Sequence, residues 1–258
     1  MKGKIKTKKE KVLISGATGF LGKKLMKVFA ADGFEVVGTA SEKKSKMLKM
    51  DITDADEVRK IIVAEKPDVV VHAAATTKVD WCEDNKEEAF RINVDGSVNV
   101  ANACKKIGAK MVYISTDYVF DGTKKGKYVE TDKRNPIGVY AQSKAAAEVA
   151  IEKILGNHII ARVTVLYGCN DDEDRQTFVT HVINTLREGK EFVGFTDQEN
   201  CPTYIDDIAD ALVQLIKKDE KGIFHLTGAE NLSRHAFTMK IAKVFGFDQK
   251  LIKKGSWD

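Results

Sequence analysis

The chain has 258 residues, of which 43% are hydrophobic and 31% charged, with a net charge of +4. No apolar run approaches the ~20 residues needed to span a bilayer, and the basic start "MKGKIKTKKEK" contains no apolar signal core. We therefore expect a soluble, cytoplasmic protein that neither enters a membrane nor is exported. The basic residues are not interleaved with aromatic ones, which argues against nucleic acid as a partner.

The cysteines argue against a metal site and against disulfides. Cys82, Cys104, Cys169 and Cys201 lie far apart in the sequence and form no Cys-x-x-Cys pair. The five histidines show no metal-ligand spacing either. We expect reduced thiols and no bound metal.

The predicted elements alternate between short apolar strands and amphipathic helices. Strands are predicted at residues 11–16, 34–40, 67–75, 109–116 and 157–168, and helices at 20–33, 54–66, 87–108 and 140–155. After residue 168 the pattern loosens to helices at 176–190, 205–218 and 233–246, with a short strand at 222–228.

This alternation predicts the fold class. Strands that alternate with helices form parallel βαβ units, and right-handed crossovers turn them into a doubly wound α/β sheet of the Rossmann type. We expect a dinucleotide-binding domain over residues 1–160. A smaller substrate-binding part over 161–258 would be interleaved with this core.

The first turn of the fold carries a glycine motif, "GATGFLG" at residues 16–22. Gly16 would allow the tight turn, Gly19 would let the backbone approach a pyrophosphate, and Gly22 would pack the helix closely. The phosphates would then lie at the helix N-terminus, where free N–H groups attract anions. We predict a dinucleotide site that also includes Thr18, Phe20 and Leu21.

The end of the second strand bears on the choice of cofactor. In "TASEKKSK" no acidic residue ends the strand, and lysines follow. Such a loop favours NADP(H), with Ser41 and Lys43 near the 2′-phosphate, while NAD(H) and a merely solvated lysine loop stay open. Small residues in "HAAA" would let the cofactor lie against Ala73, Ala74 and Ala75.

The motif spacing Gly-x-x-Gly-x-x-Gly resembles the short-chain dehydrogenase/reductase superfamily. The resemblance implies a Tyr four residues before a Lys, and "YAQSK" supplies Tyr140 and Lys144. Residues i and i+4 share one helix face. By the same resemblance Tyr140 is the general acid, Lys144 lowers its pKa and holds the nicotinamide ribose, and Asp51 with Ile52 meets the adenine. The Thr116 hydroxyl orients the substrate carbonyl, and Ser115 is the alternative residue for this role.

The stretch "STDYVFDG" at 115–122 is more specific and resembles the dTDP-4-dehydrorhamnose reductase family of extended short-chain reductases. The likeness covers nearly the whole chain and includes residues 51–53, 79–94, 140–144, 162–168, 196–212 and 222–228. It implies an NADP(H)-dependent reductase of a nucleotide-linked 4-keto-6-deoxy sugar. Asp117, Tyr118 and Val165 would contact that sugar, and Arg162 or Arg175 could meet its phosphate.

Two departures from the family keep other functions open. Family reductases often carry a Trp where this chain has Val165, and they usually run further at the C-terminus. The segment "RVTVLYG" also resembles the regulatory β subunit of methionine adenosyltransferase, an NADP-binding relative with a protein partner. An epimerase or dehydratase would retain the same Tyr and Lys. The partner would therefore be a nucleotide sugar, a second copy of the chain, or a methionine adenosyltransferase-like protein.

Overall fold

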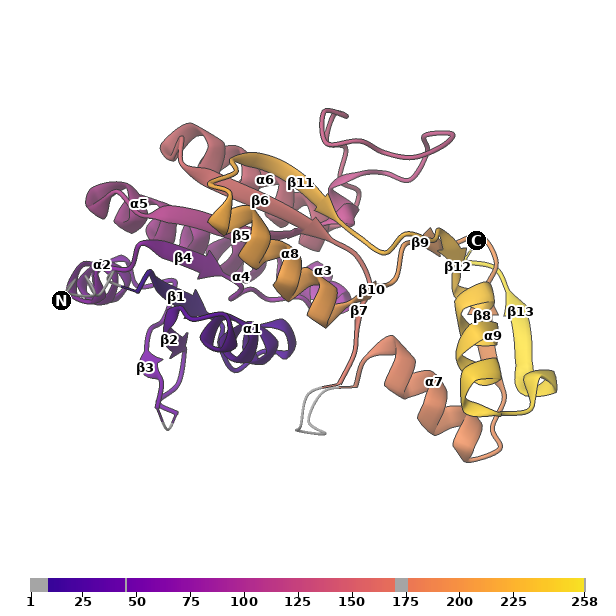
Figure 1. Ribbon diagram of the computed structural model, residues 1–258. Helices are drawn as coiled ribbons and strands as arrows, with labels where there is room; N and C mark the ends of the chain where they lie inside the picture. The colour runs from indigo at the N-terminus through magenta and orange to yellow at the C-terminus, as the bar shows by residue number, and fades with distance from the viewer. Residues whose placement is uncertain (1–8, 45, 170–175, 258) are drawn as a thin grey trace. The chain divides into compact units, whose positions relative to one another are not determined.

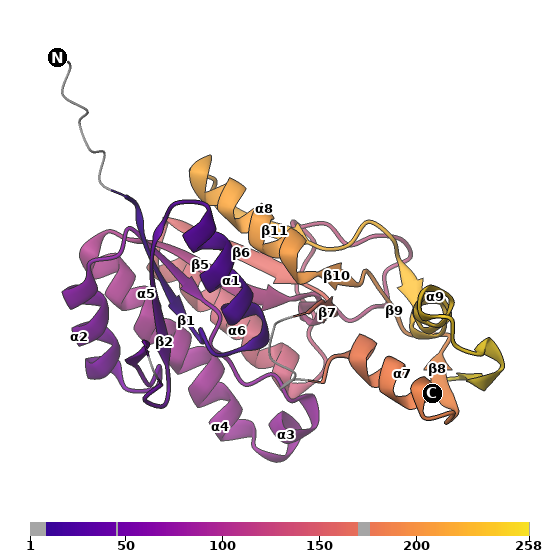
Figure 2. The same ribbon diagram turned by 60° about the horizontal axis from the view of Figure 1, so that its bottom comes forward.

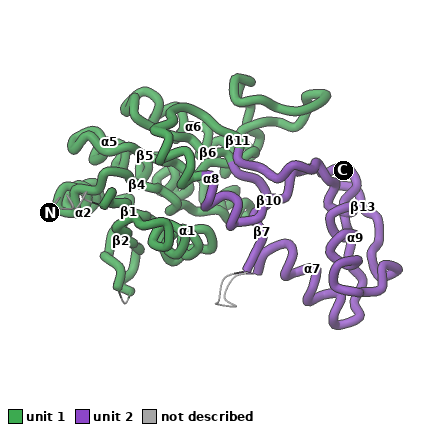
Figure 3. The backbone as a smooth tube through the Cα atoms, viewed as in Figure 1, with its two compact units in different colours: residues 1–162, 212–225 green, residues 163–211, 226–258 purple. Residues whose placement is uncertain are grey.

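The computed structural model describes residues 9–44, 46–169 and 176–257 (Figure 1). The basic leader and Arg175 lie outside these ranges. The chain forms two compact units, one of residues 1–162 and 212–225 and the other of residues 163–211 and 226–258 (Figure 3). Residues 212–225 thus return to the first unit, so the two units interleave along the chain.

The first unit is built on a seven-stranded sheet in the order β11-β6-β5-β4-β1-β2-β3. The pairs β1–β2, β1–β4, β2–β3 and β4–β5 are parallel, which confirms the predicted doubly wound fold. The strand order reverses between β1 and β4, where ligands bind in such sheets. The strands are β1 Lys11–Ser15, β2 Glu35–Ala40, β3 Leu48–Lys49, β4 Val69–His72, β5 Lys110–Thr116, β6 His158–Val163 and β11 Gly222–Leu226.

Helices cover both faces of this sheet. Helix α1 lies on one face, and α2, α5 and α6 lie on the opposite one (Figures 1 and 2). The latter three pack against the strands in one core, to which α2 gives Val58, α5 gives Val100 and α6 gives Ile151. The helices are α1 Phe20–Ala31, α2 Ala55–Glu65, α3 Val79–Asp84, α4 Lys86–Phe90, α5 Gly96–Ile107 and α6 Val139–Ile154, with a 3₁₀ turn at Asp117–Val119.

Local chemistry accounts for the ends of these helices. The Asp54 side chain accepts hydrogen bonds from the N–H groups of Asp56 and Glu57 and so caps α2. Helix α5 ends at Gly108, whose φ of 73° is the left-handed conformation that glycine adopts without steric cost. Both ends were marked in the sequence by these residue types.

Two predicted elements are interrupted. The helix predicted over 87–108 contains a π-helical turn at Arg91–Asp95 between α4 and α5. The strand predicted over 157–168 breaks after β6 and resumes only as β7 Leu166–Tyr167. At the break Val165 has a φ of 35°, which is strained for a β-branched residue and cannot continue a strand.

The second unit has its own core around Val182, Phe192, Phe237 and Ile252. Its elements are β7, α7 Phe178–Arg187, β8 Phe192–Phe195, β9 Glu199–Asn200, β10 Thr203–Tyr204, β12 Leu232–Ser233, α9 Arg234–Phe245, a 3₁₀ turn at Gln249–Leu251, and β13 Ile252–Gly255. Helix α8 Ile205–Lys217 begins in this unit and ends in the first. Among all described helices, none combines the length and apolarity that crossing a bilayer requires.

Candidate active site

The glycine turn is too tight for side chains at two of its three glycines. A Cβ on Gly16, whose φ is 69°, would lie 2.7 Å from the backbone nitrogen of Ala74. A Cβ on Gly22 would lie 2.1 Å from the carbonyl oxygen of Gly16. Gly16 therefore packs against the end of β4, and Gly22 packs against the turn itself. At Gly19 the nearest atom to an added Cβ would be the Gly16 carbonyl oxygen, at 3.2 Å. The protein itself therefore excludes a side chain less strictly at Gly19 than at the other two glycines, and a bound ligand would exclude it more.

The N-terminus of α1 suits an anion. Gly19 is its N-cap residue, and among the described residues no side chain caps the helix and no acidic residue lies in its first turn. The positive end of the helix dipole therefore faces the turn without a compensating carboxylate. Ala73 and Ala74 follow β4 directly: the Ala73 N–H donates to the Ser15 carbonyl oxygen at 3.2 Å, and the Ala74 N–H donates to the Ser15 hydroxyl at 3.4 Å. These residues fit a dinucleotide pyrophosphate.

Of the residues predicted to contact the adenosine, some are exposed, whereas others are buried or already accept hydrogen bonds. Ser41 and Lys43 are exposed in the loop after β2. The Asp51 carboxylate accepts hydrogen bonds from the N–H and hydroxyl of Thr53, which lower its pKa. Ile52 is buried in the core, so its side chain is turned away from solvent. Contact between these residues and a cofactor stays a prediction.

The predicted catalytic side chains do come together. The Thr116 hydroxyl, at the end of β5, donates to the Asp117 carboxylate at 3.2 Å and lies close enough to the Tyr140 phenol, in the first turn of α6, to lower its pKa. Lys144 follows one turn later, and its Nζ donates to the Ile114 carbonyl oxygen at 2.7 Å. Ser115 points elsewhere, since its hydroxyl donates to Glu148. The geometry therefore favours Thr116 over Ser115 as the hydroxyl beside Tyr140.

The pKa values of this pair differ from the prediction. Burial raises the pKa of Tyr140, although the nearby Thr116 hydroxyl opposes this, and burial lowers the pKa of Lys144 to about 7. The predicted lowering of the Tyr140 pKa by Lys144 is thus wrong for the protein on its own. The reason is geometric: the Lys144 Nζ lies 4.0 Å from the centroid of the Tyr113 ring and bonds a carbonyl.

The lowered pKa of Lys144 predicts a pH-dependent stability. Between about pH 7 and 10.5 the unfolded chain holds a proton on Lys144 that the folded chain has lost, so raising the pH in this window favours folding. Relative to Lys144→Met, wild-type stability should rise by up to about 1.4 kcal/mol per pH unit. Chemical denaturation at several pH values measures this difference. The exposed Lys105→Met should show no such slope, and a pH-independent difference for Lys144→Met would refute the lowered pKa.

Two polar groups that support the site were not found from the sequence. Asn93, on the π-helical turn, accepts from the Thr76 N–H, donates to the Thr76 carbonyl oxygen, and donates to the Ser143 hydroxyl at 2.9 Å. It thereby ties the loop after β4 to α6. His72 lies buried between the Ser15 and Ser97 hydroxyls, and burial lowers its pKa to about 3, so it is neutral. For Asn93, the available signal in the sequence was an Asn at a buried position of an amphipathic helix.

The predicted substrate contacts are unevenly supported. The Tyr118 ring packs edge-on to Tyr140, with ring centroids 6.1 Å apart, and the Asp117 carboxylate raises the pKa of Tyr140. Val165 belongs to the second unit and packs against its core. Arg162 is fully buried and bonds Glu148, so the prediction that it meets a substrate phosphate is wrong.

A glycine turn at the switch point of a parallel sheet, with Tyr and Lys one helical turn apart beside a Thr, defines a short-chain dehydrogenase/reductase type of site. The chain belongs to the RmlD substrate binding domain family, whose model matches residues 10–256. This confirms the resemblance seen in the sequence.

Individual relatives include two of the functions that the sequence left open. The chain is 35% identical to dTDP-4-dehydrorhamnose reductase of Aggregatibacter actinomycetemcomitans, over 95% of this chain and 80% of that protein. It is 34% identical to methionine adenosyltransferase 2 subunit beta of Bos taurus, over 91% of this chain and 72% of that protein. Its fold is similar to the crystal structure of dTDP-4-dehydrorhamnose reductase from Bacillus anthracis in complex with NADP. That similarity has a TM-score of 0.90 and 32% identity, and it covers 97% of this chain and 85% of the other.

Proposed function

We propose that the protein is an NADP(H)-dependent reductase that converts the ketone of a nucleotide-linked 4-keto-6-deoxy sugar to an alcohol. The observation that carries this proposal is the Thr116 hydroxyl beside the Tyr140 phenol, with Lys144 one turn away, at the carboxyl edge of the sheet. The similarity to two dTDP-4-dehydrorhamnose reductases supports the choice of substrate class.

In this mechanism the protein positions groups and moves a proton. The bound nicotinamide would supply the hydride to the ketone carbon. Thr116 would hold the ketone oxygen by a hydrogen bond, and the Tyr140 hydroxyl would deliver its proton to that oxygen. Lys144, one turn after Tyr140 in α6, would hold the nicotinamide ribose of the bound cofactor. The Tyr118 ring beside Tyr140 would help exclude water.

An NADPH-oxidation assay against a panel of nucleotide-linked sugars tests the proposal. We expect absorbance at the nicotinamide band to fall with dTDP-4-dehydrorhamnose or a related 4-keto sugar and to stay constant with the matching 4-hydroxy sugars. An epimerase or dehydratase would instead convert a sugar with no net oxidation of NADPH. A protein that binds NADPH but oxidises it with no keto sugar would contradict the proposal.

The lysine loop should set the cofactor preference. We expect tighter binding of NADPH than of NADH, because Lys43 and Lys44 are exposed after β2, where the 2′-phosphate would lie. Replacing both by Ala should narrow the ratio of dissociation constants roughly three- to tenfold, since exposed charge pairs are individually weak. Nicotinamide fluorescence titration measures both constants. The double variant Lys105→Ala, Lys106→Ala, at the far end of α5, should leave the ratio unchanged, and a wild type that prefers NADH would refute the assignment.

The second candidate is a cofactor-binding subunit of a methionine adenosyltransferase, favoured by the 34% identity to the bovine beta subunit. Light scattering after size-exclusion chromatography would test it, with the chain and a methionine adenosyltransferase mixed at equal concentration. The reductase proposal predicts separate elution, whereas a stable joint peak would favour the subunit role.

A further inference from the structure

One buried carboxylate lies at the centre of a cluster that the proposed mechanism does not use. Glu148, in α6, is fully buried and accepts four hydrogen bonds. Arg162 donates from Nε at 3.0 Å and from a terminal nitrogen at 2.8 Å, Arg134 donates from Nε at 2.5 Å, and the Ser115 hydroxyl donates at 2.5 Å. Arg134 also pairs with Glu152, which balances the charges.

The cluster joins the end of β5 to α6 next to the catalytic groups. Three consecutive residues of β5 lie against three residues of α6: the Ile114 carbonyl accepts from Lys144, the Ser115 hydroxyl donates to Glu148, and the Thr116 hydroxyl lies beside the Tyr140 phenol. Ser115 is the middle of these contacts. Its bond to a carboxylate is charge-assisted and therefore the more directional kind of hydrogen bond.

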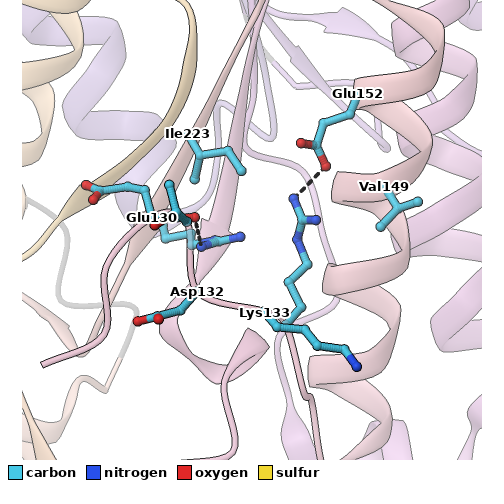
Figure 4. A pocket seen from close by; sticks show the side chains of 9 residues that line it. Glu130, Asp132, Lys133, Val149, Glu152 and Ile223 are labelled. Atoms are coloured by element: carbon cyan, nitrogen blue, oxygen red, sulfur yellow. Dashed lines mark hydrogen bonds and ion pairs between the residues drawn. The ribbon is translucent and has the colours of Figure 1, made fainter. Parts of the chain in front are cut away.

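Arg162 fixes the carboxylate from the other side and cannot easily move. Its guanidinium lies 5.0 Å from the centroid of the Phe120 ring and 3.4 Å from the Glu130 carbonyl oxygen. Phe120 belongs to the stretch "STDYVFDG", so that stretch is held at both Ser115 and Phe120. The outer end of the cluster reaches an open pocket of about 690 Å³, lined by Glu130, Arg134, Val149, Glu152 and Ile223 among others (Figure 4).

A buried ion pair of this kind adds little net stability compared with apolar packing of the same volume. Its geometric effect is more specific, because a two-point Arg–carboxylate contact fixes both position and orientation. A misplacement of about 1 Å at a reacting group can cost roughly 10²-fold in rate. A rigid carboxylate that holds the residue before Thr116 therefore matters for the chemistry.

We propose that Glu148, held by Arg162, is a positioning residue for the reduction: through Ser115 it sets the distance between Thr116 and Tyr140. Glu148 touches neither substrate nor cofactor in this role. The inference rests on the proposed reductase function for its kinetic consequence, but its structural part concerns only the placement of Thr116 beside Tyr140.

The variant Ser115→Ala tests this proposal, because it removes the tether and leaves Glu148 bonded to both arginines. We expect kcat for dTDP-4-dehydrorhamnose to fall roughly 10- to 100-fold. KM and the dissociation constant of NADPH should stay within about twofold. Thr238→Val, which removes a buried hydroxyl bonded to the Arg234 carbonyl in α9, should leave kcat unchanged. An unchanged kcat for Ser115→Ala would overturn the proposal, and so would a raised KM at constant kcat, which would place Ser115 on the substrate.

A second measurement needs no turnover. In protein labelled with ¹³C at the tyrosine Cζ, the Tyr140 resonance is identified by its absence in Tyr140→Phe and reports the surroundings of the Tyr140 hydroxyl, including the position of Thr116. Ser115→Ala should shift this resonance and Thr238→Val should not. If the wild type reduces no keto sugar and the shift is still seen, the reductase function fails and the positioning role stands. An unmoved resonance would refute the positioning role whatever the activity.

Discussion

Tyr140→Phe should lower turnover of the keto sugar by roughly 10²- to 10⁴-fold, the range expected when a general acid is lost. The substitution removes one hydroxyl from a largely buried ring, so packing against Tyr118 should persist. The dissociation constant of NADPH should change little, because the phenol is not part of the glycine turn. Steady-state kinetics with separate cofactor titration measure both quantities.

Tyr128→Phe is the matched control for this prediction. It also removes a phenolic hydroxyl, one that donates to Asp121 at 2.6 Å, but it lies in the loop beyond the 3₁₀ turn. Its turnover should stay within about threefold of the wild type. If Tyr140→Phe retained more than about a tenth of wild-type turnover, Tyr140 would not be the proton donor.

Gly19→Asp should abolish tight cofactor binding while leaving the fold intact. The residue is the N-cap of α1 in an extended conformation, which suits Asp, so the carboxylate would itself accept from the N–H groups of Leu21 or Gly22. Those donors would no longer be available to a pyrophosphate, and the new charge would repel it. Loss of two charge-assisted hydrogen bonds, about 3 kcal/mol, corresponds to at least about 10²-fold in affinity.

Gly156→Asp is the control for Gly19→Asp, because it introduces the same charge at a different position. A Cβ on Gly156, between α6 and β6, would meet nothing within 4 Å, so Gly156→Asp is accommodated equally well. It lies at the amino end of β6, away from the edge where ligands bind in such sheets. NADPH titration should show wild-type affinity for Gly156→Asp. Unchanged affinity in Gly19→Asp would mean that the pyrophosphate lies elsewhere.

Features encoded by short-range patterns could be predicted from the sequence. The glycine turn needs only a strand, three glycines and a helix in succession, and Tyr140 and Lys144 share a helix face through their spacing alone. The alternation of strands and helices likewise predicted the doubly wound sheet, which the structure confirms.

Features that depend on contacts between distant segments could not be predicted from the sequence. The contact between Arg162 and Glu148 could not be predicted, because nothing local in the sequence shows that Glu148 lies opposite Arg162. The periodicity that suggested one strand over 157–168 carries no signal for the positive φ of Val165. The pKa of Tyr140 also depends on burial, which spacing alone does not determine.

Transfer of an isotope tests the central claim most directly. Wild-type protein would be incubated with dTDP-4-dehydrorhamnose and NADPH deuterated at either the 4R or the 4S position of the nicotinamide, and the sugar product analysed by mass spectrometry. The reductase function predicts a product one mass unit heavier with one of the two labelled cofactors, and no such product with Tyr140→Phe on the same time scale. Binding of NADPH without a deuterated product from either label would contradict it.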